Sequence, residues 1–283
     1  MPVEHYRWKT ARPKDFGTIE AFLRQHEPYL VGAASRFIVF LPRRDQFVFN
    51  QDRDNRIGAF LFRSGGILHP YFLDYPPVKA SRILRRFVGL PFHKRIYSVQ
   101  GLIRDVSIAE ESLFREAYQV QDQFDYYLMH LVMPVRSPPL PEGLRIVDNP
   151  APDLVYPLQA AYEKEEVIPA HSGFYEPHCR LGLERIFKEE TLVYAEYEGL
   201  PAAKANTNAR SFTYCQIGGV YVKPELRGRG IASYVVGTLV ERIQQKGLKV
   251  SLFVKKRNLA AQRVYEKLGF ETIGEYRINY YRG

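Results

Sequence analysis

Apolar and polar positions along the second half of the chain predict a mixed α+β domain. Strands are expected at residues 144–147, 191–197, 202–207, 212–222, 250–254, 270–273 and 276–281. Helices with one apolar face are expected at residues 153–165, 174–189, 231–245 and 258–268. The hairpin signal at residues 198–201 favours antiparallel pairing of the strands that it joins. The predicted order of elements is βααβββαβαββ.

The first half of the chain repeats this rhythm more loosely. Helices are expected near residues 18–25, 80–87 and 107–117, and strands near residues 47–50, 57–62, 67–71, 96–99 and 126–132. The pattern therefore predicts a second α+β domain and indicates an internal structural duplication.

A proline-rich stretch separates the two halves. Four prolines occur between Pro134 and Pro141, and they exclude both helix and strand pairing. We therefore predict a first domain at residues 1–133, a linker at residues 134–141 and a second domain at residues 142–283.

Composition narrows the class of protein. Apolar residues make up 46% of the chain and charged residues 25%, which is typical of a folded globular protein. Met1 to Phe16 lacks the apolar core of a signal peptide and no later run is long enough to span a bilayer, so we expect a cytoplasmic protein without membrane contact. The two cysteines, Cys179 and Cys215, have no paired Cys or His spacing, so neither a disulfide framework nor a metal site is expected.

The net charge of +9 favours a polyanionic partner. Nucleic acid is one such partner, but the chain has no basic block and no recognised nucleic-acid motif. We keep nucleic-acid binding only as a third hypothesis, which predicts a steeply salt-dependent affinity for DNA or RNA.

The segment Arg227-Gly228-Arg229-Gly230-Ile231-Ala232 is the strongest chemical signal, because it lies between a predicted strand and an amphipathic helix. The first amides of a helix lack internal partners, and glycine permits close backbone approach. The helix dipole and the two arginines add positive potential. This turn is therefore predicted to bind a pyrophosphate.

Residues 219–232 resemble the acetyl-CoA motif of the GNAT superfamily of acyltransferases. The family's Arg/Gln-x-x-Gly-x-Gly/Ala signature is matched by Arg227, Gly230 and Ala232. Its second motif is matched by residues 258–270, which follow a buried strand. The resemblance covers Leu144 to Tyr281. The whole chain is also similar to bacterial two-domain GNATs whose first half is a degenerate copy without the phosphate loop.

The resemblance implies a GNAT fold, which is a mixed, mostly antiparallel sheet that splays open and is flanked by helices. Gly218 and Gly219 mark the place of the splay, where the pantetheine arm would pair with backbone groups of Val220 and Val222. Acetyl-CoA, or another short acyl-CoA, would be the co-substrate, without a metal. The acceptor would be an amine on a small molecule or a peptide. The implied cofactor-binding residues are Val220, Tyr221, Val222, Arg227, Gly228, Arg229, Gly230, Ile231, Ala232, Asn258 and Tyr265.

Asn258 and Tyr265 both lie on the last predicted helix, at residues 258–268. Asn258 is a suitable N-cap, and Tyr265 lies about two helical turns further on the same face. The family implies that this tyrosine protonates the departing thiolate. A reference pKa near 10 keeps a tyrosine protonated at neutral pH.

The general base is not evident from the sequence. Many family members carry a glutamate on the strand before the phosphate loop, but Gln216 stands at that position and residues 212–222 contain no acid. The remaining candidates are Glu165, Glu166 and His171, and we select Glu166 as the predicted catalytic base. The alternative interpretation of these glutamates is a solvated helix end.

A rival hypothesis is a non-catalytic acyl-CoA sensor or interaction protein, which the missing strand glutamate and the degenerate first half both favour. It predicts acyl-CoA binding without turnover. Covalent transfer through Cys215 is a lesser alternative, because no histidine is visibly paired with that cysteine.

Overall fold

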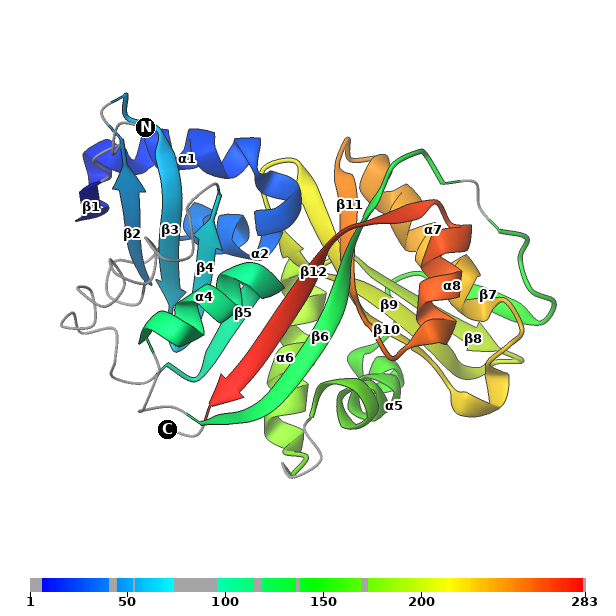
Figure 1. Ribbon diagram of the computed structural model, residues 1–283. Coiled ribbons are helices and arrows are strands. Elements are labelled where there is room, and N and C mark those ends of the chain that lie inside the picture. The colour runs from blue at the N-terminus through cyan, green and yellow to red at the C-terminus, as the bar shows by residue number, and fades with distance from the viewer. Residues whose placement is uncertain are drawn as a thin grey trace. The chain divides into compact units, whose positions relative to one another are not determined.

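The computed structural model describes residues 7–40, 45–52, 54–73, 96–113, 119–135, 138–168 and 173–281. They form two compact units, unit 1 at residues 1–127 and 274–283 and unit 2 at residues 128–273 (Figure 1). The end of the chain belongs to unit 1 because the last strand, β12 (Phe270–Tyr281), pairs with β5 (Ser98–Leu102) from Tyr276 to Tyr280. The boundary predicted from the proline-rich linker places residues 274–283 in the second domain. The predicted domains and the observed units therefore differ at this end of the chain.

Unit 2 contains the elements predicted for the second half. Its helices are α5 (Pro152–Tyr162), α6 (Glu176–Glu189), α7 (Ile231–Gln244) and α8 (Leu259–Lys267). A single π-helical turn, η3 (Glu163–Val167), extends α5, and a 3-10 turn, η4 (Pro224–Leu226), precedes α7. Its strands are β7 (Leu144–Val147), β8 (Leu192–Tyr197), β9 (Leu200–Arg210), β10 (Tyr214–Val222) and β11 (Lys249–Lys255).

The sheet of unit 2 is mixed and mostly antiparallel, as predicted. The order within it is β11-β10-β9-β8-β7, and only β10 and β11 run parallel. Their pairing extends from Tyr214 opposite Lys249 to Ile217 opposite Leu252 and stops there, although both strands continue. The two strands therefore separate at Gly218 and Gly219, where the sequence predicts the splay.

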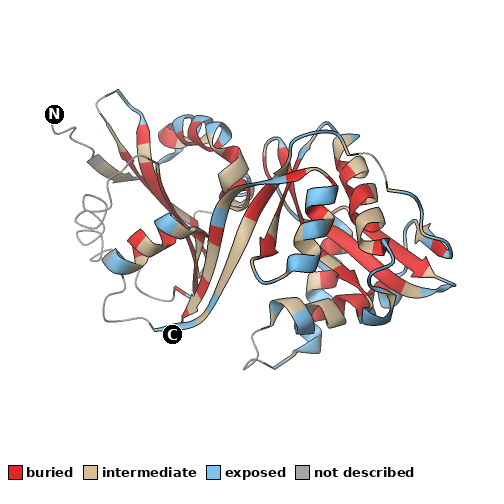
Figure 2. Ribbon diagram, turned by 45° about the vertical axis from the view of Figure 1, so that its right-hand side comes forward, coloured by how far each residue is buried: buried red, intermediate tan, exposed pale blue. Residues whose placement is uncertain are grey.

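The core of unit 2 lies on both faces of this sheet. Tyr194 of β8 packs with residues of α5 and α6, whereas its neighbours Val193 and Ala195 point to the other face and are equally buried. That other face is covered by α7, which contacts β8, β9 and β10. Figure 2 shows how the buried residues follow the strands of each unit. The apolar face predicted for α7 is confirmed, because all of its predicted apolar positions are buried. The buried positions are Ile231, Val235, Val236, Leu239, Val240 and Ile243.

Unit 1 is also an α+β unit. Its helices are α1 (Phe16–Gln25), α2 (Glu27–Ile38) and α4 (Ile103–Leu113). Its remaining strands are β1 (Arg7–Thr10), β2 (Asp45–Gln51), β3 (Ile57–Ser64) and β4 (Ile67–Phe72), and β6 (Val120–Leu131) crosses the unit boundary. The sheet order is β1-β2-β3-β4-β5-β12, with only β4 and β5 parallel. An antiparallel meander followed by one parallel pair thus recurs in both units.

Aromatic side chains fill the core of unit 1. The rings of Phe47 and Phe60 stack with centroids 4.9 Å apart, and Phe60 also stacks on Tyr71 at 5.6 Å. Phe47, Phe49, Phe60 and Phe62 are all nearly inaccessible to solvent. Offset and edge-to-face aromatic pairs stabilise a core beyond their buried area.

Three expectations need correction. Helix α2 is not among the predicted elements. Its Pro28 occupies the first turn of the helix, where the missing N–H costs nothing. The two predicted closing strands are one strand, β12, which runs through Gly274. Residues 163–165 continue α5 as a π turn rather than as an α-helix. The predicted helix at residues 80–87 and the end of that at residues 107–117 lie outside the described residues.

Replacing Leu239 by alanine should destabilise unit 2. Leu239 lies on the apolar face of α7 and is fully buried. The cavity that a deleted leucine side chain leaves lowers the free energy of unfolding by about 2–5 kcal/mol. Urea unfolding followed by circular dichroism measures the loss. The exposed Gln245→Ala, just beyond the same helix, should change stability by less than about 0.5 kcal/mol. Equal losses in the two variants would contradict the assigned packing of α7.

Candidate active site

The separation of β10 from β11 depends on a bulge in β10. The pairing of β10 with β9 shifts register between Gly218 and Tyr221, and Gly219 adopts φ +58°. A Cβ atom on Gly219 would lie 2.1 Å from Asn206 Oδ1, and one on Gly218 would lie 2.4 Å from Asn208 Nδ2. Only glycine fits both positions, because the side chains of β9 occupy the space that a Cβ would need.

Lys204 of β9 holds this bulge from beneath. Its side chain is fully buried, and its Nζ donates hydrogen bonds to the Gly219 carbonyl at 2.8 Å and to Asn206 Oδ1 at 2.7 Å. The Nζ also lies 5.1 Å from the centre of the Tyr162 ring. Burial lowers the pKa of Lys204 to about 7, although the nearby Glu163 carboxylate acts in the opposite direction. A buried amine with two fixed acceptors therefore orients the Gly219 peptide.

The predicted phosphate turn has the backbone geometry that anion binding needs. Gly228 and Gly230 have φ +79° and +78°, and Gly230 is the N-cap of α7. No side chain caps α7, so its first amides have no side-chain partner. The amides and the positive end of the helix dipole therefore form a site for a phosphate group.

A cavity of about 690 Å³ connects this turn with the splayed strands. Nine of the eleven predicted cofactor-binding residues line it, and they are Val220, Tyr221, Val222, Arg227, Gly228, Gly230, Ile231, Ala232 and Asn258. Arg229 does not line it, because its guanidinium donates to the Tyr197 hydroxyl at 3.3 Å. Tyr265 lies behind the lining, with its ring edge against Phe270. The two sequence motifs therefore converge on one space.

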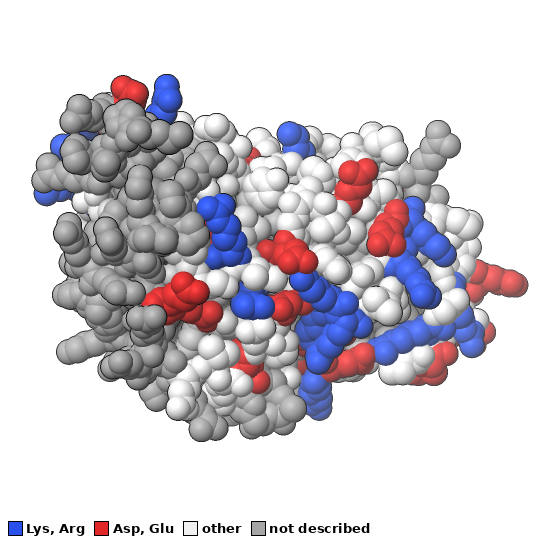
Figure 3. All heavy atoms as spheres, viewed as in Figure 1, with Lys and Arg blue, Asp and Glu red and all other residues white. Residues whose placement is uncertain are grey.

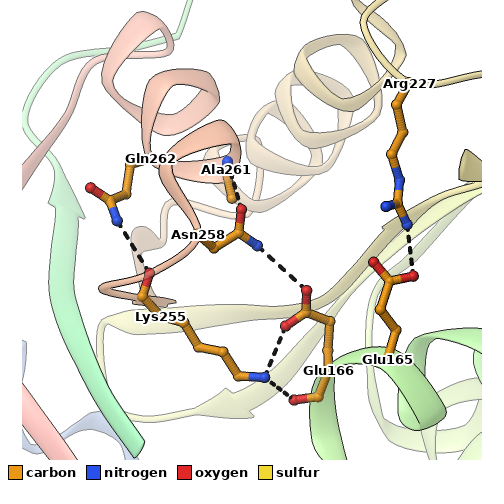
Figure 4. Close-up of polar contacts among 7 residues, drawn as sticks. All are labelled: Glu165, Glu166, Arg227, Lys255, Asn258, Ala261 and Gln262. Atoms are coloured by element: carbon orange, nitrogen blue, oxygen red, sulfur yellow. Dashed lines mark hydrogen bonds and ion pairs between the residues drawn. The ribbon is translucent and has the colours of Figure 1, made fainter.

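Arg227 is tied to the π turn η3. Its Nη2 forms an ion pair with Glu165 Oε2 at 2.8 Å (Figure 4). Its Nε donates to the Val222 carbonyl at 3.0 Å. The arginine therefore lies along the cavity wall with one carboxylate neighbour. A bound phosphate could replace that carboxylate, because both groups accept two N–H donors from a guanidinium.

Glu166 is tied to the opposite wall. Its carboxylate forms an ion pair with Lys255 at 3.0 Å and accepts a hydrogen bond from Asn258 Nδ2 at 3.4 Å (Figure 4). Asn258 Oδ1 accepts from the Ala261 amide at 3.1 Å, which confirms the predicted N-cap of α8. Both carboxylate oxygens of Glu166 are thus engaged by side chains from another segment of unit 2.

Two buried tyrosine hydroxyls lie near the bulge. Burial raises the pKa of Tyr265 well above its usual value, and nearby Tyr162 and Glu166 raise it further. Burial also raises the pKa of Tyr162 to about 12, partly opposed by a hydrogen bond with the Gly219 backbone. Both phenols therefore stay protonated at neutral pH.

Lys204 and Tyr162 escape the sequence analysis. A lysine in a strand is normally assigned to the solvent face, and Tyr162 belongs to no motif. The one available signal is the pair of adjacent glycines, which indicates that a neighbouring strand carries side chains that fill the missing Cβ positions.

The next two observations, on metal binding and on membrane spans, concern only the residues that the structure describes. None of them form a group of three or more His, Cys, Asp or Glu side chains that could hold a metal, and none of the described helices is long and apolar enough to cross a membrane. Burial raises the pKa of the Cys215 thiol, which disfavours a reactive thiolate. His171 lies outside the described residues. Lys and Arg side chains gather among Asp and Glu on the face that Figure 3 shows, rather than forming an unbroken basic stripe there.

The comparisons with known proteins agree on one family. Residues 156–270 match the family model of the acetyltransferase (GNAT) family. No curated protein matches the chain.

Solved structures similar to nearly the whole chain include two bacterial GNAT-family proteins. One, from Sphaerobacter thermophilus, has a TM-score of 0.61 and 16% identity and covers 97% of this chain and 94% of its own. Another, from Colwellia psychrerythraea, has a TM-score of 0.58 and 13% identity over 98% of this chain and 100% of its own. A tandem GNAT protein from the clavulanic acid biosynthesis pathway has a TM-score of 0.60 and 12% identity over 99% of both chains. At these identities the likeness shows the fold, including a GNAT-like unit before the C-terminal domain.

Gly219→Ala should destabilise the chain more than an equally strained glycine substitution elsewhere. Gly247 has a similar φ of +71° with open space around it, so Gly247→Ala carries the backbone cost alone, about 1 kcal/mol. Gly219→Ala adds a clash with Asn206 and Lys204. Urea unfolding of the two variants measures the difference, and equal stabilities would show that the bulge is not held as described.

Lys204→Met should flatten the pH dependence of stability. Lys204 has a pKa of about 7 when folded and 10.5 as a free side chain, so between pH 7 and pH 9 the unfolded chain binds one more proton. The free energy of unfolding of the parent chain should therefore gain about 2 kcal/mol from this group over that range. The variant should lack this gain, and the exposed Lys188→Met should retain it. An unchanged pH dependence in Lys204→Met, measured by urea unfolding, would contradict a depressed pKa.

Proposed function

Because the C-terminal domain of this chain belongs to the GNAT superfamily of acetyltransferases, we propose that unit 2 binds acetyl-CoA and transfers its acetyl group directly to an amine. The observation that carries the proposal is the 690 Å³ cavity, which joins the splay at Val220 to the phosphate turn at Gly228 and Gly230. A related short acyl-CoA would bind in the same way.

The residues of the cavity fit the parts of this co-substrate. The uncapped amides of α7 and Arg227 offer donors to a pyrophosphate. The free backbone edge of β10 at Val220 and Val222 offers the pairing that an extended pantetheine arm requires, since β11 has turned away. The neutral amine attacks the thioester carbonyl of acetyl-CoA, so that the N–C bond forms and the C–S bond breaks. The proton that the nitrogen loses ends on the departing sulfur, which leaves as the thiol of CoA.

Tyr265 is proposed to donate a hydrogen bond to the departing sulfur of CoA. This hydrogen bond stabilises the negative charge that develops on the sulfur as the C–S bond breaks. Its raised pKa keeps the phenol protonated throughout the neutral range. The same shift makes it a weak acid, so its main contribution is a hydrogen bond in the transition state rather than early proton transfer.

Glu166 is proposed to act through Lys255 and Asn258 as a positioning residue, in place of the base predicted from the sequence. Its carboxylate links the π turn η3 to the start of α8, and these two segments form opposite walls of the cavity. Both oxygens of this carboxylate already have partners, Lys255 and Asn258, which suits it to holding these segments together.

The second candidate function, an acyl-CoA sensor, is favoured by Gln216. This residue stands where many relatives carry the strand glutamate, and its buried Oε1 has no hydrogen-bond partner among the described residues. The sensor would bind acetyl-CoA in the same cavity without turnover.

Calorimetric binding of acetyl-CoA and thiol release with a broad panel of amines separate the two functions. We expect binding and sustained thiol release that depends on the amine. Tyr265→Phe should lower kcat about a hundredfold and leave the acetyl-CoA affinity within a few-fold, because it removes a transition-state hydrogen bond. Tyr234→Phe, which removes a phenol hydroxyl from α7 without a proposed role, should leave both unchanged. Full activity of Tyr265→Phe would refute the proposed role, and binding without turnover would establish the sensor.

A further inference from the structure

A second cavity, of about 430 Å³, lies within unit 2 on the other side of the bulge. Its walls come from α5, η3 and α6, and its floor comes from β9. Among the residues that line it are Gln159, Glu163, His178, Arg185, Asn206 and Gly219. Gly219 lines this cavity and the next residue, Val220, lines the larger one, so the two cavities adjoin at one peptide.

Gln159, which lines this second cavity, carries a hydrogen-bond acceptor without a donor. Gln159 is 5% exposed, and its Nε2 donates to Glu163 Oε1 at 2.8 Å. A carboxylate accepts but does not donate, which fixes the amide with its oxygen turned away from Glu163. That oxygen, Oε1, is buried and has no partner among the described residues. Since an unsatisfied buried acceptor is costly, it points to a ligand with an N–H or O–H donor.

The floor of the second cavity does not supply that donor. The Asn206 amide nitrogen donates to the Thr207 carbonyl at 2.8 Å, and its oxygen accepts from Lys204. The Thr207 hydroxyl donates to Glu190 at 2.5 Å. These buried groups are satisfied, and the half-buried Glu163 carboxylate already accepts from Gln159 and from the Cys179 thiol. Gln159 Oε1 is therefore the acceptor that remains for a ligand's N–H group, and Glu163 adds negative charge beside it. A primary amine supplies several such donors.

The outer end of the second cavity is exposed to solvent and carries a positively charged side chain. His178 and Arg185 of α6 line it and are both exposed, with 48% of the Arg185 side chain accessible. Arg185 approaches Glu189 only to 3.9 Å, and that exposed pair is weak. Its guanidinium can therefore turn to an anionic group of a ligand whose other end reaches Gln159.

We propose that this second cavity binds the acceptor as a small amine that also carries an anionic group, a carboxylate or a phosphate. The amine nitrogen lies at Gln159 and Glu163 beside the bulge, and the anionic group faces Arg185. The proposal rests on the proposed acetyl transfer, because it assigns the other substrate of that reaction.

The test compares amines in matched pairs, each amino carboxylate with its carboxamide and each aminoalkyl phosphate with its amino alcohol. We expect thiol release with a kcat/KM about tenfold or more higher for the anionic member of at least one class, which also tells carboxylate from phosphate. Arg185→Gln should reduce that ratio about threefold to tenfold by lowering the value for the anionic member alone. Lys188→Gln, an equal charge change on α6 outside the cavity, should leave the ratio unchanged.

The role of Gln159 is tested with Gln159→Leu. It should raise the KM for the amine about tenfold while the acetyl-CoA affinity and the thermal midpoint stay close to those of the parent chain. If Gln159→Leu fails to fold, amine turnover, acetyl-CoA binding and the thermal transition are all lost. The exposed Arg185→Gln is then the variant that decides the proposal.

The failure of this inference is distinguishable from that of the proposed function. Turnover of neutral and anionic amines at equal rates, or a preference that Arg185→Gln does not change, overturns the inference and leaves acetyl transfer intact. If the chain binds acetyl-CoA without turnover, thermal shifts with the same amine pairs replace kinetics, and equal shifts within every pair overturn the inference. Absence of both acetyl-CoA binding and thiol release overturns the proposed function and the inference with it.

Discussion

The site of unit 2 depends on two hydrogen bonds that the side-chain nitrogen of Lys204 donates. Burying a lysine is costly, so it persists only where its donors are met by fixed acceptors. Here the acceptors are the Gly219 carbonyl and Asn206 Oδ1. Together they keep β10 bulged at a place where a regular ladder would have continued next to β11. The open edge of β10, which we propose as the pairing surface for an acyl-CoA, lies at this bulge.

The bulge also organises the space on both sides of the sheet opening. The larger cavity extends toward the cationic phosphate turn, while the smaller one extends between α5 and α6 toward Arg185. The π turn η3 contributes to both, since Glu165 and Glu166 line the first and Glu163 the second. A π turn widens a helix by one residue, and such turns occur often at functional sites. The extra residue allows three nearly consecutive glutamates to point into different surroundings.

Sequence patterns could predict the elements of unit 2 and the phosphate turn because both are local. The apolar face of α7 and the N-cap at Asn258 depend on residues within a few positions of one another. Lys204, Tyr162 and Gln159 could not be predicted, because their roles depend on β9, α5 and β10 meeting in space. Glu166 shows the same limit. Its place near the cavity is expected from the sequence, but Lys255, which engages its carboxylate, lies far along the chain.

Unit 1 shows why a shared topology is not sufficient for the same chemistry. Its β3 and β4 pair without any register shift, from Ala59 opposite Phe72 to Ser64 opposite Ile67, whereas β9 and β10 shift twice. Stacked aromatic rings fill the core beside β3, and Pro70 on β4 offers no backbone N–H to a ligand. The described part of unit 1 thus lacks the glycine bulge that a buried lysine holds open in unit 2. In the described part of unit 1, a regular β3–β4 ladder beside stacked aromatic rings thus stands in place of the bulge that Lys204 holds in unit 2.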